Sequence, residues 1–158
     1  MTAQPDTMRA AVAAIRGALS KFVYVATSER QFASQVGKAL ALFGCGDPPR
    51  GVNATAWREH QLWVREEVAT PGGRVDIVCT YAAGTYEVVS VAIELKVRGV
   101  VSAVESQVRC YARAGFDAVG LVTTNQTLAA NLQQGHEWVD GLTVFCGCPY
   151  FVVPLRSF

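Results

Sequence analysis

Residues 86–97 are the feature that most constrains the fold, because this segment is apolar on both faces of an extended chain. Its apolar members are Val88, Val89, Val91, Ile93, Leu95 and Val97. Such a pattern is typical of a central strand that is covered on both sides. Glu94 and Lys96 lie within it, two residues apart and therefore on one face. Alone they would be read as an ordinary ion pair on a solvated face, but charges in a central strand are costly without a purpose.

Asp76 lies in a second strand-like run, residues 74–81, which precedes the central strand and is joined to it by a turn at 83–85. If these two strands pair as neighbours, Asp76 joins Glu94 and Lys96. Two carboxylates and one ammonium are the minimum set that can hold Mg²⁺ against a phosphodiester and activate a water. The sequence therefore predicts a metal-dependent site at this place, although Asp76 could also be a solvated acid near a turn.

The remaining periodicities predict helices and strands in alternation. Helices are expected over 7–19, over 28–43 with Ser28 as N-cap and Gln31 in the capping-box position, over 102–114 with Ser102 as N-cap, and over 127–134. Strands are expected over 61–69 with Leu62, Val64, Glu66 and Val68 on one face, then over 74–81, 86–97, 117–123, 142–146 and 150–153. The first three strands should form an antiparallel meander, and the strand at 117–123 should run parallel to the third. This order predicts an α/β fold with a mixed central sheet flanked by helices.

Composition adds broad limits. A chain of 158 residues with 51% hydrophobic residues predicts one domain, 1–158, with a substantial core. A net charge of +1 gives no overall field for nucleic acid, so any basic surface must be local. The five cysteines are expected to be free thiols, because their number is odd and Cys79 and Cys110 lie inside a predicted strand and helix. A zinc site is not expected, because Cys146 and Cys148 have no second Cys/His pair at zinc spacing.

Localisation and assembly follow from the apolar segments. No stretch reaches about 18 apolar residues, and the start lacks the pattern of a secretory signal, so we expect a cytoplasmic protein without membrane contact. The apolar ending at 142–153 is too short for its own core. It must pack on the main sheet or on a partner, which makes a homodimer a hypothesis.

The order of elements and charges resembles the PD-(D/E)xK nuclease superfamily over residues 28–124. Val75-Asp76 takes the place of Pro-Asp, and Glu94-Leu95-Lys96 takes the place of (D/E)xK. Gln107 and Tyr111 match the QxxxY motif of the branch that includes RecB-type exonucleases and related resolvases. The resemblance implies a restriction-endonuclease-like core of helix, three antiparallel strands, helix and strand at about 28–124. The N-terminal helix at 7–19 and a C-terminal extension at 125–158 would lie outside that core.

The resemblance and the residue chemistry imply a Mg²⁺-dependent nuclease acting on DNA, with Mn²⁺ as a substitute metal. Asp76, Glu94 and the backbone carbonyl of Leu95 would hold the metal, and Glu29, on the first helix of the core, would hold a metal-bound water or a second ion. Lys96 would orient or help to deprotonate the attacking water and stabilise charge on the phosphate. Gln107 and Tyr111, at i and i+4 on one helix face, would position the phosphate or the strand beside the site. The basic residues expected to contact phosphates are Arg74, Arg98, Arg109 and Arg113.

Plainer interpretations stay open at this stage. Glu29 could be a first-turn acid that favours the helix dipole, Tyr111 a core residue and Gln107 a solvated one. Trp57 and Trp63 are expected in the core rather than on a surface that stacks nucleotides. The chain could also be a catalytically inactive module of the same fold that binds DNA or a protein partner, or an enzyme of another class that uses the same carboxylates.

Overall fold

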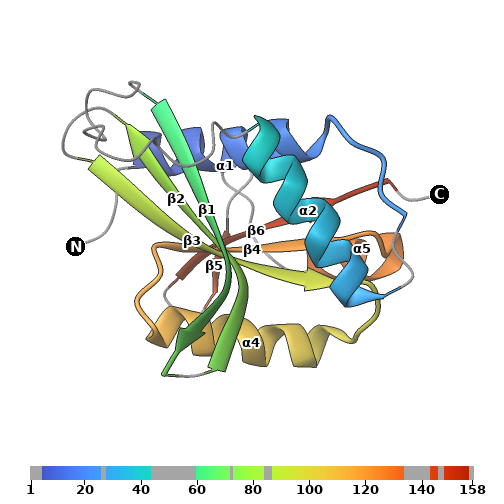
Figure 1. Cartoon of the computed structure of the whole chain (residues 1–158). Helices are drawn as coiled ribbons and strands as arrows, with labels where there is room; N and C mark the ends of the chain where they lie inside the picture. Colours follow the sequence, from blue (N-terminus) through green and yellow to red (C-terminus); the bar gives the residue numbers. More distant parts are fainter. Residues whose placement is uncertain are drawn as a thin grey trace.

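A computed structural model shows one mixed sheet between two layers of helices (Figure 1). It describes residues 5–25, 28–43, 60–71, 73–83, 87–133, 143–145 and 148–156. The helices of this part are α1 (Pro5–Leu19), α2 (Glu29–Phe43), α4 (Val101–Arg113) and α5 (Gln126–Gln133). The strands are β1 (His60–Thr70), β2 (Gly73–Ala83), β3 (Glu87–Lys96), β4 (Ala118–Thr123), β5 (Thr143–Phe145) and β6 (Cys148–Pro154). The predicted α/β class, with a mixed sheet flanked by helices, is confirmed.

The strands of the described residues form one six-stranded sheet in the order β1-β2-β3-β4-β6-β5. β1, β2 and β3 are antiparallel neighbours, as expected of a meander with short turns. β4 pairs in parallel with β3, which it follows through α4, and this pairing was also predicted. The C-terminal strand β6 lies parallel to β4 inside the sheet, and its Phe151 is fully buried. The apolar ending therefore packs on the main sheet, while the homodimer stays a prediction.

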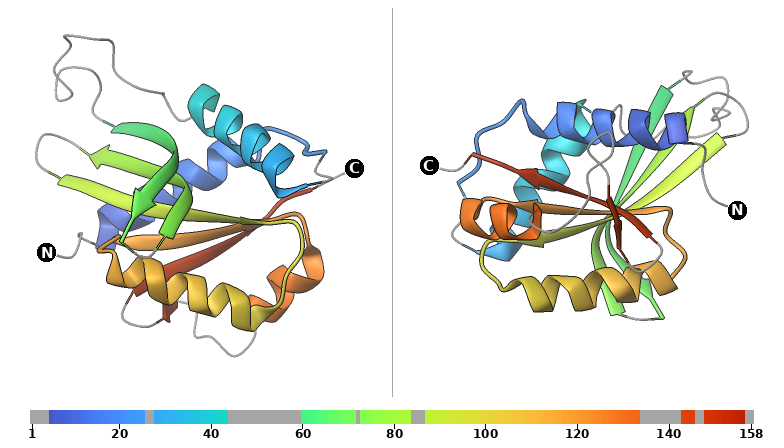
Figure 2. Two further views of the ribbon diagram at one scale, coloured as in Figure 1. Left: turned by 60° about the horizontal axis from the view of Figure 1, so that its bottom comes forward. Right: turned by 180° about the vertical axis from the view of Figure 1, so that it is seen from behind.

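Helices cover both faces of the sheet (Figure 2). The buried residues between sheet and helices form a separate apolar cluster on each face. The first cluster joins α1 and α2 to the sheet, with Ile15, Phe32 and Leu40 fully buried among strand residues. The second cluster joins α4 and α5 to the other face, through Val104, Tyr111 and Leu128 among others. β3 and β4 are central, so they are covered on both sides, as an uninterrupted run of apolar residues predicts.

β1 changes the face that it presents to the helices near Glu67. Val64 packs against the first cluster, whereas Val68 packs against the second. Between them Glu67 has a φ of 49°, in the left-handed region that residues other than glycine rarely adopt. The prediction that Leu62, Val64, Glu66 and Val68 share one face is therefore wrong for Val68, because the backbone rotates at Glu67.

The helix starts agree with the sequence at α2 and differ at α4. The backbone N–H of Gln31 donates to Ser28 Oγ at 3.2 Å, so Ser28 is the predicted N-cap. At α4 the predicted cap, Ser102, is wrong: the helix begins at Val101, and the N-cap is Val100, without a side-chain cap bond. The physical reason is the preceding turn, in which Gly99 at φ 157° leads into an extended Val100.

Several expectations fall on residues that the structure does not describe. These are the helix break after residue 43, Trp57, residues 84 and 85 of the turn predicted at 83–85, residue 86 of the third strand, Leu142 and two of the cysteines, Cys45 and Cys146. Trp63 is half-buried in β1, and its indole Nε1 is buried without a hydrogen-bond partner among the described residues. Within the described ranges, no helix is long and apolar enough to cross a membrane.

Candidate active site

Asp76 and Glu94 lie at the same level on the neighbouring antiparallel strands β2 and β3. The paired residues of these strands extend to Ile77 and Ile93, and Asp76 and Glu94 come next along each strand. At this point a side chain replaces the backbone pairing, because Asp76 Oδ2 accepts a hydrogen bond from the backbone N–H of Leu95 at 3.1 Å. Asp76 is therefore fixed against β3 beside Glu94, and its Oδ2 is committed to the backbone.

Glu94 is buried, with 5% of its surface exposed, and both of its oxygens have partners. The hydroxyl of Tyr111 donates to Oε2 at 2.6 Å, and Lys96 Nζ lies 3.2 Å from Oε1. Burial raises the pKa of Glu94, and the negative charge of Asp76 raises it further, while Tyr111 and Lys96 act in the opposite direction. A cation placed between Asp76 and Glu94 would relieve this repulsion.

Tyr111 connects α4 to the carboxylate. Its hydroxyl accepts a hydrogen bond from Gln107 Nε2 at 2.7 Å and lies 3.2 Å from the carbonyl oxygen of Arg74. A hydroxyl has one proton to donate, and it donates this proton to Glu94, whose oxygen is closer than the Arg74 carbonyl. Burial raises the pKa of Tyr111, and the bond to Glu94 adds to the effect, so the phenol stays a donor. Gln107 and Tyr111 share a helix face, but both act here on Glu94.

Lys96 bridges β3 and α2. Its Nζ lies 3.9 Å from Glu29 Oε1 in addition to its contact with Glu94. Burial lowers the pKa of Lys96, but the charges of Glu94, Glu29 and Asp76 outweigh burial, so the net shift is upward. A lysine with a raised pKa keeps its proton, which favours stabilisation of negative charge over removal of a proton from water.

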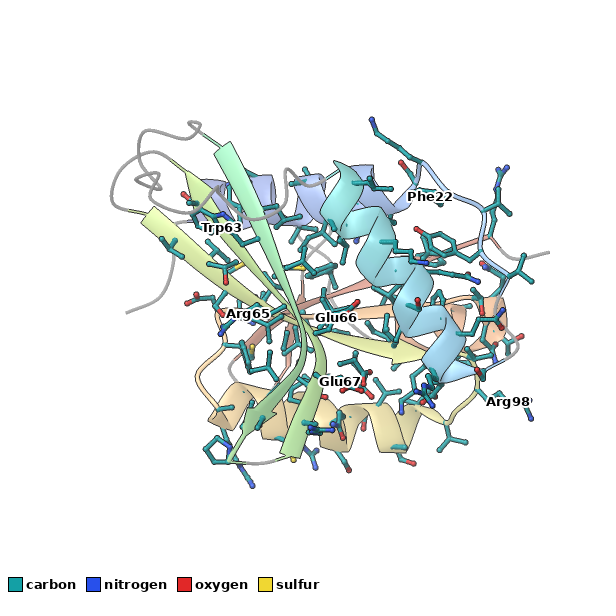
Figure 3. All side chains as sticks on the ribbon, viewed as in Figure 1. Phe22, Trp63, Arg65, Glu66, Glu67 and Arg98 are labelled. Carbon is teal, nitrogen blue, oxygen red and sulfur yellow. The ribbon has the colours of Figure 1, made fainter. Side chains whose placement is uncertain are left out.

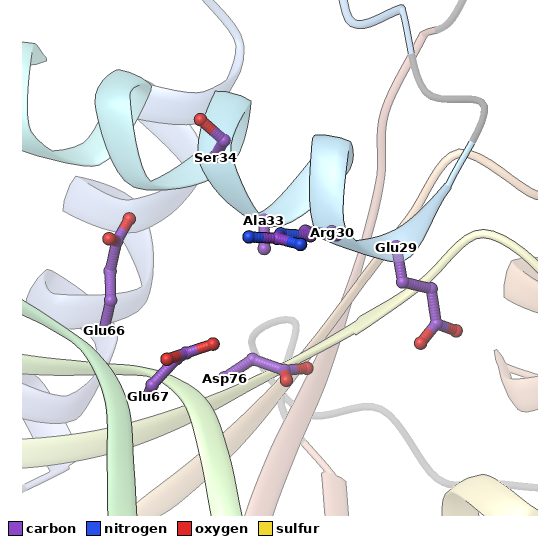
Figure 4. Close-up of a pocket in the computed structure, with 7 residues that line it drawn as sticks. All are labelled: Glu29, Arg30, Ala33, Ser34, Glu66, Glu67 and Asp76. Carbon is purple, nitrogen blue, oxygen red and sulfur yellow. The ribbon is translucent and has the colours of Figure 1, made fainter.

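A cleft of about 480 Å³ opens beside Asp76, between α2 and the β1–β2 hairpin (Figure 4). It is lined by Glu29, Arg30, Ala33, Ser34, Glu66, Glu67 and Asp76. Glu66 closes the cleft against α2, because a Cβ on Gly37 would collide with its carboxylate. Sequence reasoning missed Arg30, Glu66 and Glu67. The sequence carries no signal for them, since the cleft depends on how α2 meets β1.

None of the four arginines expected to contact phosphates lines this cleft, and Arg74 reaches it only through Glu67. Arg74 Nη1 is 3.9 Å from Glu67 Oε2, and the arginine and glutamate side chains are 72% and 75% exposed. Arg98 is exposed after β3, at the right of the view in Figure 3, apart from Glu66 and Glu67 of β1 near the centre. Arg109 and Arg113 are exposed on α4, whose buried face carries Tyr111. The structure thus does not bring these arginines to Asp76 and Glu94.

The donor set suits a hard divalent cation bound by few protein ligands. Among the described residues, no group of three or more His, Cys, Asp or Glu side chains could hold a metal. Asp76 and Glu94 are two adjacent carboxylates, so a cation at this place would need backbone oxygen and water in addition. The Leu95 N–H faces β2, and an extended residue directs its N–H and C=O to the same side, so the Leu95 carbonyl faces the same strand. Mg²⁺ accepts such a set, because it keeps several waters.

Glu29 belongs to the edge of the site. Its side chain is 51% exposed, and its carboxylate contacts Lys96 from the first turn of α2. It lines the cleft together with Asp76.

Comparison of the chain with protein-family models, with curated proteins and with solved structures gives no match.

Proposed function

We propose that this chain is a Mg²⁺-dependent nuclease that hydrolyses phosphodiester bonds in DNA, with a restriction-endonuclease-like core of the PD-(D/E)xK type and its QxxxY branch. One observation carries the proposal. Glu94 is buried between the Tyr111 hydroxyl and the Lys96 ammonium, beside Asp76 on the neighbouring strand. Two adjacent carboxylates, one of them buried, are expensive, and the single charge of Lys96 balances only one of them, which favours a bound cation beside them.

Each residue of this group has a defined task in the proposal. Asp76, Glu94 and the Leu95 carbonyl would hold Mg²⁺ or Mn²⁺, and Glu29 would hold a coordinated water or a second ion. A bound divalent cation would supply Lewis acidity toward the phosphate and lower the pKa of a nearby water. Lys96 keeps its positive charge and stabilises the negative charge that develops on the phosphate oxygens. Tyr111, supported by Gln107, fixes the orientation of Glu94.

The cleft beside Asp76 supports a polymeric phosphate ester as the substrate. It is open along the β1–β2 hairpin, and its volume of about 480 Å³ lies within the range of ordinary ligand pockets. Five of its seven lining residues are ionisable, four acids and one arginine, so a charged ligand bound together with a cation suits it better than a neutral one. The carboxylates of the lining would repel a polyanion in the absence of metal. Both DNA binding and cleavage should therefore require a divalent cation.

The test is cleavage of end-labelled duplex, single-stranded and branched DNA by the purified protein with Mg²⁺, Mn²⁺, Ca²⁺ or EDTA. The variant is Asp76→Asn, and Glu105→Gln, on α4 and outside the cleft, is the matched acidic control. Cleavage should appear with Mg²⁺ and Mn²⁺, whereas Ca²⁺ should support binding with little turnover, because Ca²⁺ takes a larger and more flexible coordination shell.

Asp76→Asn should lose cleavage and keep its fold, while Glu105→Gln should behave as wild type. If the wild type binds DNA but neither it nor Asp76→Asn cleaves any substrate, the inactive binding module becomes the better account. Failure of the wild type both to bind and to cleave would reject the nucleic-acid proposal altogether.

A further inference from the structure

Arg30 places a positive charge inside the cleft. It belongs to the first turn of α2, and its guanidinium lies between the helix and the strands, on the side of Asp76 and Glu67 (Figure 4). It is exposed in the open part of the cleft. A molecule that occupies the cleft would therefore meet the guanidinium and the Asp76 carboxylate together.

The Arg30 guanidinium makes no ion pair with the described acids that line the cleft, so it can bind a ligand. The other ionisable side chains that line the cleft are all acids: Glu29, Glu66, Glu67 and Asp76. Among the described residues, Arg30 makes no ion pair with any of them. Lys96, by contrast, is held by Glu94 and Glu29. Within the described lining, Arg30 is thus the one cation that a ligand can use.

We propose that Arg30 binds a phosphate group of the nucleic-acid strand that lies in the cleft between α2 and the β1–β2 hairpin. This inference rests on the proposed nuclease function and adds the path of the substrate. A guanidinium donates two parallel hydrogen bonds to a phosphate, which fixes position as well as charge. The strand that is cut would pass under α2, and the exposed arginines of α4 would lie off its path.

The experiment measures binding of short single-stranded and duplex oligonucleotides by fluorescence anisotropy, with Ca²⁺ present and NaCl varied. The variants are Arg30→Gln and Arg30→Lys. Arg65→Gln is the matched control, because Arg65 is an exposed arginine on β1 that does not line the cleft. Arg109→Gln tests the competing path over α4. Thermal melting is recorded for each variant to show that it is folded.

Arg30→Gln should weaken binding at least about 10-fold and reduce the slope of log K against log [salt] by about 0.7 to 0.9, the change expected for one lost phosphate contact. Arg30→Lys should keep the slope but recover only part of the affinity, because an ammonium lacks the planar fork. Arg65→Gln and Arg109→Gln should match the wild type. In cleavage assays, Arg30→Gln should raise KM more than it lowers kcat.

The outcomes separate this inference from the function on which it rests. If the wild type cleaves DNA while Arg30→Gln binds like Arg65→Gln, the inference is overturned and the nuclease stands. If Arg109→Gln rather than Arg30→Gln changes the salt slope, the strand runs over α4 and the inference again fails. A wild type that neither binds nor cleaves overturns both. If Arg30→Gln unfolds, Arg30→Lys decides: reduced affinity at an unchanged slope supports the contact, and unchanged affinity rejects it.

Discussion

Two buried tyrosines on opposite faces of the sheet show how the two cores differ. Tyr24, in the first cluster, donates its hydroxyl to the carbonyl of Leu19 at 2.8 Å and packs edge-on against Phe32. Tyr111, in the second cluster, donates to the Glu94 carboxylate at 2.6 Å. Burial raises the pKa of both phenols, to about 12 for Tyr24. The first tyrosine satisfies a neutral backbone group, whereas the second holds a charge.

The same difference extends to the surroundings of each tyrosine. Glu94 is the only charged residue among the buried side chains that the structure describes, and it lies on the face of α4. The first cluster, under α1 and α2, is apolar apart from satisfied hydroxyls. We infer that the interior of the first cluster mainly stabilises the fold, whereas the second cluster anchors the buried carboxylate next to Asp76 and the cleft under α2. Substitutions that are matched across the two faces can test this division.

Lys96→Met should give the largest effect. It removes the ammonium and keeps most of the apolar stem, so cleavage should fall at least about 100-fold, the usual loss when a positioned charge-stabilising group is removed. Single-turnover assays at saturating Mg²⁺ measure the chemical step. Melting temperature should fall modestly, since Glu94 loses the partner of Oε1. Lys96→Arg should restore the melting temperature and part of the rate. Full activity of Lys96→Met would make Lys96 a purely structural partner of Glu94.

Tyr111→Phe and Tyr24→Phe compare the two faces directly. Tyr24→Phe loses a bond to a neutral carbonyl and should lose about 1 kcal/mol in the free energy of unfolding. Tyr111→Phe loses its bonds to Glu94 and Gln107 and should lose about 1.5–3 kcal/mol. Only Tyr111→Phe should also weaken Mg²⁺ binding and cleavage, by about 10- to 100-fold, the usual effect of removing a group that orients a metal ligand. Titration calorimetry with Mn²⁺ and urea unfolding measure the two quantities. Equal metal affinity in both variants would contradict the division between the faces.

The central part of the site could be predicted from the sequence because local patterns determine it. The apolar run around Glu94 indicates a central strand, a short turn makes β2 its antiparallel neighbour, and Asp76 then comes to the same level. Helical spacing predicts that Tyr111 and Gln107 share one face of α4, and the QxxxY resemblance predicted that this face meets the site. The sequence did not predict that Tyr111 would donate to Glu94, because this bond depends on how α4 packs on the sheet.

The cleft could not be predicted, because it arises where segments distant in the sequence meet. The left-handed backbone of Glu67 rotates β1, and the contact of Glu66 with Gly37 sets how closely α2 approaches the strand. Neither feature has a local pattern. The place of β6 beside β4 is of the same kind, since Gly120 accommodates Phe151 so tightly that a Cβ there would lie within 2.5 Å of the ring. The wrong cap at Ser102 has a local cause, the turn at Gly99.

The pH dependence of the melting temperature of Glu94→Gln tests how much the buried, charged carboxylate of Glu94 destabilises the fold. Because the fold raises the pKa of Glu94, its protonated form is favoured in the native state. The stabilisation that the fold gains from protonated Glu94 is fully present below the ordinary pKa of 4.5, and it is lost as pH rises through the raised pKa of the folded protein. Glu94→Gln, which is uncharged throughout, should therefore melt about 2–4 °C above the wild type at neutral pH, and the two should converge in acid. A neutral-pH melting temperature below that of the wild type would mean that Lys96 and Tyr111 outweigh burial.

Gln107→Ala should give the smallest effect, because Gln107 reaches Glu94 only through the Tyr111 hydroxyl. We expect a loss of about two- to fivefold in Mn²⁺ affinity, which corresponds to the lower end of coupling energies between contacting residues. In a Tyr111→Phe background the same substitution should change nothing, since the hydroxyl that it supports is gone. A double-mutant cycle with calorimetric Mn²⁺ titration measures this coupling. An equal loss in both backgrounds would show that Gln107 acts independently of Tyr111, and a loss of DNA affinity alone would place it on the substrate.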